Sequence, residues 1–314
     1  MAIVVAGEAL IDLVPDGEDG LRGHPGGGPY NTARTLGRLE QPVHYLGCVS
    51  RDAFGHRLRE QLRADGVALD TAVDTELPTT LALVELDPAG AASYRFYIDG
   101  TSAAALAPEP ALAALPERLE MLHVEGGCIA LGLETHPTAL GLRALIEAAA
   151  DRALVMVDPN CRPLSIPDRA AYRRGLAATL RHAHVVKASG DDLAFIEPSL
   201  GPADAARSLL ADGPSVALVT LGGDGALIVT AAGEEMVAAP PVDVVDTIGA
   251  GDAFSGGFLA WWHLRGHGRA ELADPAALRA ATAFACTVAA RTCERPGASP
   301  PTLAEVSSDL ERQL

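Results

Sequence analysis

From residue 121 onward, short apolar runs alternate with longer stretches of helical periodicity. This alternation predicts an α/β fold built on a doubly wound, mainly parallel sheet with right-handed crossovers. The predicted strands are Ala2–Ala6, Pro42–Ser50, Met121–Val124, Cys128–Leu131, Leu154–Asp158, His184–Lys187 and Val216–Thr220. The predicted helices are Thr32–Leu39, Phe54–Ala64, Pro137–Asp151, Arg169–Arg181 and Pro202–Ala211.

Polar residues or glycines follow each of the later predicted strands. They form the segments Asp158–Pro163, Ser189–Asp192 and Gly222–Gly225. In a doubly wound sheet, ligands bind outside the carboxyl ends of the strands. Since these segments would lie in a row at that edge, we expect a ligand site there.

The stretch from Pro241 to Trp262 predicts a short strand (Val242–Val245), a glycine turn (Gly249–Gly251) and a buried helix. The start of a helix has unpaired N–H groups, and glycine lets a ligand approach the backbone, so the turn suits a phosphate. Asp252 would repel that phosphate unless it has a task of its own. It either caps the helix or accepts the proton of a hydroxyl that attacks a phosphoryl group.

Three commoner motifs are excluded around these residues. A Walker A loop needs Gly-Lys-Ser/Thr, but the single lysine, Lys187, follows Val186. A dinucleotide fingerprint would need glycine at Phe254. A nucleophile elbow centred on Ser255 would need glycine at Ala253.

The N-terminal part carries a second candidate region. Asp12 lies in an apolar stretch, where a carboxylate is costly unless it faces water at a strand edge or binds a ligand. Three glycines precede Asn31, which either caps a helix or bonds a polar ligand. Thr79–Leu86 and Ser93–Ile98 flank the turn Asp87–Gly90 and predict a β-hairpin that stands off the main sheet as a flap.

Composition limits the classes of function. A net charge of −17 and a pI near 4.8 argue against nucleic-acid and membrane-surface partners. The five cysteines lack Cys-x-x-Cys spacing, which favours reduced thiols in a cytoplasmic protein without a zinc cluster. The N-terminal residues lack a basic region, and no apolar run is long enough to span a bilayer.

Asp246–Phe254 resembles the C-terminal signature of the ribokinase-like (PfkB) carbohydrate kinases, and Gly26–Asn31 resembles their N-terminal signature. The resemblance covers essentially the whole chain. It implies one ribokinase-like α/β domain (1–314) with a small β-sheet lid formed by about residues 10–30 and 76–102. Within the family, four segments are most similar to bacterial fructokinases: Gly7–Pro15, Phe96–Thr101, Val157–Pro163 and Arg291–Ala298.

The resemblance implies ATP and Mg²⁺ as cofactors, with K⁺ as a candidate monovalent cation. Asp252 would be the base, the amides of Gly249, Ala250 and Gly251 would bind the γ-phosphate, and Arg162 would hold the sugar or the transferring phosphate. The other implied sugar ligands are Asp12, Gly27, Gly28, Asn31 and Tyr97. The nucleotide would be bound by Lys187, Ser189, Thr220, Gly222, Gly223, Gly225, Gly249 and Gly251, with the adenine pocket completed after Cys286. Asp192 would contact Mg²⁺ through water, and Asp246 and Thr247, with the loop Arg291–Ser299, would bind the monovalent cation.

Two positions depart from the family pattern. Ser189-x-x-Asp192 replaces the family's Asn-x-x-Glu, which leaves the role of Ser189 open. Ile98 stands where related 2-keto-3-deoxygluconate kinases often carry an arginine suited to an acidic sugar. An apolar residue there favours a neutral acceptor, and therefore fructose.

We therefore expect an ATP-dependent kinase that phosphorylates a primary hydroxyl of fructose. The alternatives are another acceptor (2-keto-3-deoxygluconate, ribose or a nucleoside) and a non-catalytic sugar or nucleotide sensor. The flap would close over the sugar and exclude water. Its apolar edge could also pair with that of a second subunit, so a homodimer is an expected assembly.

Overall fold

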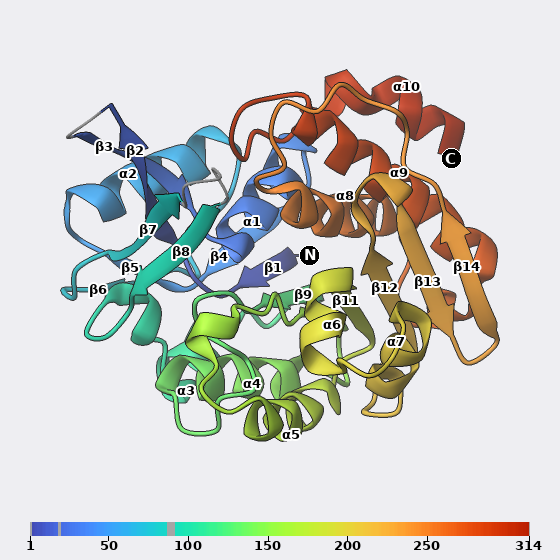
Figure 1. Cartoon of the computed structure of the whole chain (residues 1–314), viewed down its shortest axis with the longest axis horizontal. Coiled ribbons are helices and arrows are strands. Elements are labelled where there is room, and N and C mark those ends of the chain that lie inside the picture. Colours follow the sequence, from blue (N-terminus) through green and yellow to red (C-terminus); the bar gives the residue numbers. More distant parts are fainter. Residues whose placement is uncertain (1, 18–19, 87–91, 314) are drawn as a thin grey trace.

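Eight strands form the main sheet of the computed structural model, which describes residues 2–17, 20–86 and 92–313 (Figure 1). Their order is β14-β13-β12-β11-β10-β9-β1-β4. Strands β12, β11, β10, β9, β1 and β4 run parallel to one another. Strands β13 and β14 extend the sheet antiparallel at the β12 edge. The bounds are β1 Ala2–Ala6, β4 Val43–Leu46, β9 Leu119–Glu125, β10 Leu154–Asp158, β11 Val185–Ser189, β12 Val216–Thr220, β13 Ala226–Thr230 and β14 Gly233–Val237.

Helices cover both faces of this sheet, which confirms the predicted doubly wound α/β fold (Figure 1). The bounds are α1 Gly28–Arg38, α2 Ala53–Ala64, α3 Pro108–Ala114, α4 Pro137–Ala149, α5 Arg169–Leu180, α6 Gly190–Ile196, α7 Pro202–Leu210, α8 Ala250–Leu264, α9 Pro275–Cys293 and α10 Leu303–Gln313. Side chains alternate along the buried strands, as strand geometry requires. In β1, Ile3 and Val5 pack with α1, α2, α8, α9 and α10, whereas Val4 and Ala6 pack with α3 to α7.

Two of the predicted strands are wrong. Cys128–Leu131 follows β9 as bends, and the N–H groups of Cys128 and Ile129 donate to the carboxylate of Glu8. Cys128 and Ile129 are buried beneath the small sheet, and Ala130 and Leu131 are buried in the core that α3 to α7 cover, so the segment is apolar without pairing in the main sheet. Val242–Val245 is an irregular loop in which Val244 and Val245 are exposed, so its β-branched composition did not lead to strand pairing.

A second, four-stranded sheet lies at one side of the main sheet (Figure 1). Its order is β3-β2-β7-β8, with bounds β2 Leu10–Asp16, β3 Gly20–Gly26, β7 Thr80–Leu86 and β8 Ala92–Tyr97. Strands β7 and β8 pair antiparallel, as the predicted hairpin requires. The turn predicted at residues 87–90 lies outside the described residues. A further parallel pair joins β5 Cys48–Ser50 to β6 Val73–Thr75.

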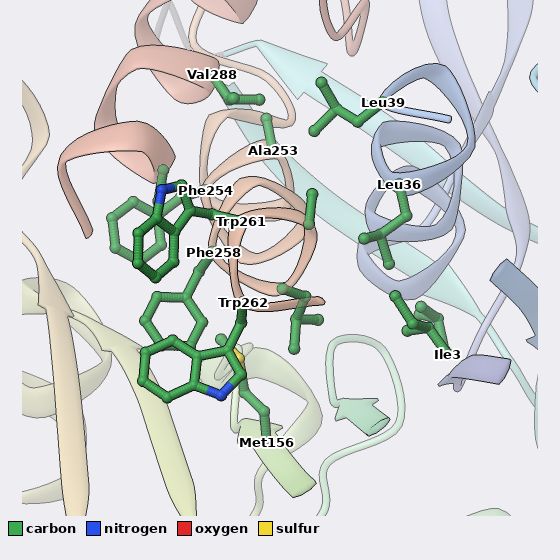
Figure 2. Close-up of a cluster of buried hydrophobic side chains, with 14 of the residues drawn as sticks. Ile3, Leu36, Leu39, Met156, Ala253, Phe254, Phe258, Trp261, Trp262 and Val288 are labelled. Atoms are coloured by element: carbon green, nitrogen blue, oxygen red, sulfur yellow. The ribbon is translucent and has the colours of Figure 1, made fainter. Parts of the chain in front are cut away.

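Helix α8 lies at the centre of one buried face (Figure 2). The rings of Phe258 and Trp262 stack with centroids 5.3 Å apart. On another side of the helix, a Cβ added at Gly256 would lie 2.6 Å from the Cβ of Thr35 in α1. Since real Cβ atoms do not approach so closely, glycine is what allows α1 and α8 to pack at this distance.

None of the helices among the described residues combines the length and the apolarity that crossing a membrane requires.

Replacing Gly256 with valine should destabilise the protein by about 2–3 kcal/mol, because overpacking would push α1 and α8 apart. Urea unfolding would measure the loss. Gly223→Val is the matched control, since an added Cβ there meets nothing within 4 Å. Its stability should stay within about 0.5 kcal/mol of the parent protein. Equal stabilities of the two variants would contradict the close packing of α1 against α8.

Candidate active site

A cleft of about 680 Å³ lies at the carboxyl ends of β10, β11 and β12 and at the first turns of α1 and α8. This is the edge at which the polar segments after the strands were expected to meet. Of the predicted site residues, the cleft is lined by Asp12, Gly27, Gly28, Asn31, Arg162, Lys187, Ser189, Asp192, Thr220, Thr247, Gly249, Gly251 and Asp252. Residues from distant parts of the sequence therefore share one cavity.

The start of α8 has the geometry of an anion site. Gly249 is its N-cap residue, with φ 79°, and no side chain of the described residues caps the helix. The N–H of Ala250 donates to the carbonyl of Thr247 at 3.2 Å, a backbone bond that leaves the other leading amides available. A Cβ at Gly249 would lie 2.7 Å from the Cβ of Ala298, so both the backbone conformation and the packing favour glycine. Unpaired amides at a helix start attract negative charge. The turn can therefore hold a phosphate.

Asp252 is the third residue of α8, so the interpretation of this residue as a helix cap is wrong. Its Oδ2 accepts a hydrogen bond of 2.9 Å from Nδ2 of Asn31. The pKa of Asp252 is raised to about 8, mainly because burial disfavours the charged carboxylate and also because of the negative charge of Glu125. The hydrogen bond from Asn31 and the charges of Lys187 and Arg162 lower the pKa. Asp252 is thus a stronger proton acceptor than an ordinary aspartate.

Asn31 lies within α1 and does not cap it, because the helix begins at Gly28. Its Nδ2 donates to Asp252, but its buried Oδ1 finds no hydrogen-bond partner among the residues that the structure describes. An unpaired buried acceptor is costly, and a hydroxyl donor would satisfy it. Asp12 lines the same part of the cleft, where burial and the charges of Glu8 and Asp252 raise its pKa to about 7. These groups suit a ligand rich in hydroxyls.

A second cavity, of about 240 Å³, adjoins the glycine turn and shares Thr220, Thr247 and Gly251 with the cleft. Its other residues are small or apolar: Gly222, Gly223, Gly225, Ala239, Pro240, Val242, Val244, Ala250, Phe254, Cys286, Ala289, Ala290 and Cys293. Val242 and Val244 thus form a wall of this cavity instead of a strand. Its apolar lining beside an anion site suits a flat base joined to phosphates.

Two predicted ligands are already engaged within the protein. The Asp192 carboxylate accepts hydrogen bonds from Ser189 N (2.7 Å), Ser189 Oγ (2.6 Å) and Cys161 N (2.6 Å), and it completes a capping box at α6. Exposed Asp191 lies beside it at the cleft. Asp246 bonds the N–H groups of Ile248 and Gly297 at 3.0 and 2.8 Å, which joins it to the loop after α9.

Tyr97 is placed outside the cleft. It is the last residue of β8, its side chain is half-exposed, and it lines a different hollow. Tyr94 and Phe96 of the same strand line the cleft instead. The strand predicted to lie near the site is the correct one, but its residues turn inward on the face opposite to Tyr97.

Glu125, one member of a group of buried polar residues beneath the cleft, was not predicted from the sequence, although Lys187 and the segment Asp158–Pro163 were. Glu125 ends β9, Asp158 ends β10, and Nζ of Lys187 lies 2.6 Å from Oδ2 of Asp158. Asn160 joins this group with its backbone in the left-handed region, at φ 40°. The available signal was Glu125 itself, an acid directly after the apolar run of β9, but the predicted strand ended one residue earlier.

The raised pKa of Asp252 predicts a pH-dependent stability. The unfolded chain has an ordinary aspartate pKa near 4. The contribution of Asp252 to stability is therefore lost as the pH rises from about 4 to about 8, because the folded protein must then ionise a buried carboxyl. We expect Asp252→Asn to be more stable than the parent protein by about 1–3 kcal/mol at pH 8.5, with a difference that shrinks toward pH 5. Urea unfolding across this range measures it. Asp243→Asn, at an exposed carboxylate, should show no such trend.

Comparison with known proteins identifies the family to which this chain belongs. Residues 2–305 match the pfkB family carbohydrate kinases. A fructokinase from Klebsiella pneumoniae is 33% identical over 317 residues, covering 99% of this chain and 99% of that protein.

Two solved structures are similar over nearly the whole chain. A double mutant of the fructokinase from Vibrio cholerae O395, in fructose, ADP and potassium ion bound form, has a TM-score of 0.85 at 26% identity and covers 98% of both chains. The aminoimidazole riboside kinase from Salmonella enterica, complexed with aminoimidazole riboside and an ATP analog, has a TM-score of 0.83 at 26% identity. It covers 99% of this chain and 100% of the other. The resemblance drawn from Asp246–Phe254 and Gly26–Asn31 is confirmed, and the chain belongs to the pfkB family of carbohydrate kinases.

Proposed function

We propose that the protein is an ATP-dependent kinase that transfers the γ-phosphate to a primary hydroxyl of a neutral sugar, with fructose as the favoured acceptor. The observation that carries this proposal is the position of Asp252, which is bonded to Asn31 and lies directly beyond the glycine turn Gly249–Gly251, where no side chain of the described residues caps the helix. A proton acceptor and an anion site are thus neighbours in one cleft. The Klebsiella and Vibrio relatives, both named fructokinases, support the choice of acceptor.

In the proposed mechanism, the amides at the start of α8 hold the γ-phosphate while Asn31 and Asp12 orient the sugar. A primary hydroxyl then points at Asp252. As its oxygen bonds to phosphorus and the bond to ADP breaks, the hydroxyl proton passes to the carboxylate. Arg162 adds positive charge near the transferring group. Most of the acceleration comes from positioning and from electrostatic stabilisation.

Mg²⁺ neutralises charge on the nucleotide phosphates when it is bound. Because Asp192 already accepts three hydrogen bonds, we assign it a contact with Mg²⁺ through water only, with Asp191 beside it. For a monovalent cation we propose Asp246 and Thr247 with the loop at residues 291–299. The hydrogen bond between Asp246 and Gly297 N keeps these two segments together.

The small sheet is proposed as the lid, since Asp12 of β2 and Tyr94 and Phe96 of β8 line the cleft from that side. Closure would exclude water from the phosphoryl group and limit ATP hydrolysis. We also propose that the lid edge forms the contact of a homodimer. Gel filtration combined with light scattering would test the assembly.

A different acceptor is the main alternative. The similarity to a kinase of aminoimidazole riboside keeps nucleosides among the candidates, together with ribose and 2-keto-3-deoxygluconate. A panel of acceptors in a coupled assay of ADP release separates these possibilities. Release with fructose well above the other acceptors is expected. Sugar and nucleotide binding without ADP release from any acceptor would favour a sensor instead.

Asp252→Asn should lower kcat by about 10²-fold or more, because the amide cannot accept the hydroxyl proton. Nucleotide binding, measured by calorimetry, should remain, since the amides and the apolar cavity are unchanged. Asp243→Asn again serves as the control and should keep full activity. An unchanged kcat would remove Asp252 from the mechanism.

A further inference from the structure

We propose that Glu125 is a positioning residue of the phosphoryl-transfer site, holding Arg162 through Asn160 and the backbone of Asp252 through Thr32. This inference rests on the proposed function and adds to it a residue that does not touch the substrate. Glu125 is the last residue of β9 and is 1% exposed. It lies at the carboxyl end of β9, which pairs with β1 and β10.

One carboxylate oxygen of Glu125 is connected to Arg162 through hydrogen bonds of Asn160. Nδ2 of Asn160 donates to Oε1 of Glu125 at 2.8 Å, and Oδ1 of Asn160 accepts from Nη1 of Arg162 at 2.6 Å. Asn160 has both ends of its amide engaged while its backbone is in the left-handed region. Such a conformation persists only where the surroundings hold it. The carboxyl of Glu125 therefore sets the direction of the Asn160 amide and, through it, of the guanidinium.

The other carboxylate oxygen of Glu125 is connected to the backbone of Asp252, the proposed base, through Thr32. The hydroxyl of Thr32 donates to Oε2 of Glu125 at 3.1 Å and also lies 3.2 Å from the carbonyl oxygen of Asp252. One hydroxyl hydrogen cannot serve both acceptors fully. A protonated Glu125 would instead donate to Thr32 and leave the threonine hydrogen for Asp252. The protonation state of Glu125 thus affects how firmly the first turn of α8 is held.

Packing shows that space is kept for this carboxyl. A Cβ added at Gly28 would lie 2.0 Å from Oε1 of Glu125 and 2.8 Å from Nδ2 of Asn160. Gly28 was predicted to bind the sugar. Its absent side chain also leaves room for the Glu125–Asn160 hydrogen bond at the first residue of α1.

The charge of Glu125 also reaches the base directly. Burial and the negative charge of Asp158 raise the pKa of Glu125 to about 8, and Lys187 opposes the shift. In turn, Glu125 is the largest charged contributor to the raised pKa of Asp252. The other charged groups that act on these two carboxyls include Lys187 of β11, Arg162 after β10, Glu8 after β1 and Asp12 of β2, and His123 of β9 contacts Glu125 at 3.3 Å. A residue that served packing alone would not need a titratable carboxyl here, because burying a polar or charged group is costly.

Glu125→Gln tests the proposal, because it keeps the shape and removes the charge. We expect kcat to fall about tenfold to a hundredfold, as for other losses of alignment, with KM for ATP nearly unchanged. The acid limb of the pH profile should move to lower pH, since Asp252 loses a negative neighbour. Glu125→Asp should lower kcat without moving the limb, because it keeps the charge but shortens the reach. Glu120→Gln, on the same strand and bonded to His263, is the matched control.

A second pair of variants covers the case in which Glu125→Gln does not fold. Thr32→Val removes the hydroxyl at nearly constant volume and should lower kcat several-fold. Thr32→Ser restores the hydroxyl and should recover most of the activity. Equal activities of these two variants would overturn the connection from Glu125 to the base.

A readout without turnover separates this inference from the proposed function. The ¹³C NMR signal of the Asp252 carboxyl, titrated in the ligand-free protein, should show a lower midpoint in Glu125→Gln and an unchanged one in Glu120→Gln. An unchanged midpoint in Glu125→Gln, or a wild-type kcat in that variant, would overturn the role of Glu125. A shifted midpoint in a protein that phosphorylates no acceptor would support the coupling of the two carboxyls and overturn the proposed function alone.

Discussion

The site depends on a helix start that is left uncapped beside a buried carboxylate. At the first turn of α8, no side chain satisfies the leading amides, and Asp252 stands two residues past the first helical residue. Each feature is unfavourable alone, because unpaired amides and a buried acid both cost free energy. Together they describe a place for a phosphoryl group with a proton acceptor at its side. The surrounding fold must therefore hold α8 firmly.

Helix α8 is held between α9 and α1. The glycine at position 256 brings the two helices close, and this approach places Asn31 and Thr32 against Asp252. The far side of α8 is fixed by aromatic packing around Phe258 and Trp262 (Figure 2). The position of the Asp252 carboxylate is thus fixed by small residues on one side of α8 and large residues on the other. The same α1 begins at the glycine that makes room for Glu125.

Much of this fold was predictable because its signals are local. Buried parallel strands such as Ala2–Ala6 and Leu154–Asp158 are apolar throughout and end in polar turns, so their bounds were predicted correctly. The errors have a physical origin in tertiary contacts. Residues 128–131 are apolar because the small sheet covers the first two and the helical core covers the other two. Part of Val242–Val245 forms a wall of the apolar cavity.

The candidate site was predictable where glycine turns and strand ends mark it, and less so where orientation matters. The turn at Gly249–Gly251 and the acid after it could be read directly from the sequence. The network around Glu125 could not, since it joins α1, β9 and the loop after β10 through side chains far apart in the chain. Likewise, neighbouring residues of β8 point to opposite faces of the small sheet, so Phe96 lines the cleft and Tyr97 does not.

The ion pair beneath the glycine turn has a practical consequence for studying the molecule. Lys187 is the only lysine of the chain, and its amine is buried and held by Asp158. A lysine-directed reagent thus meets no accessible side-chain amine while the strands around it stay packed. The rate at which such a reagent modifies this position would report how often the floor of the site opens.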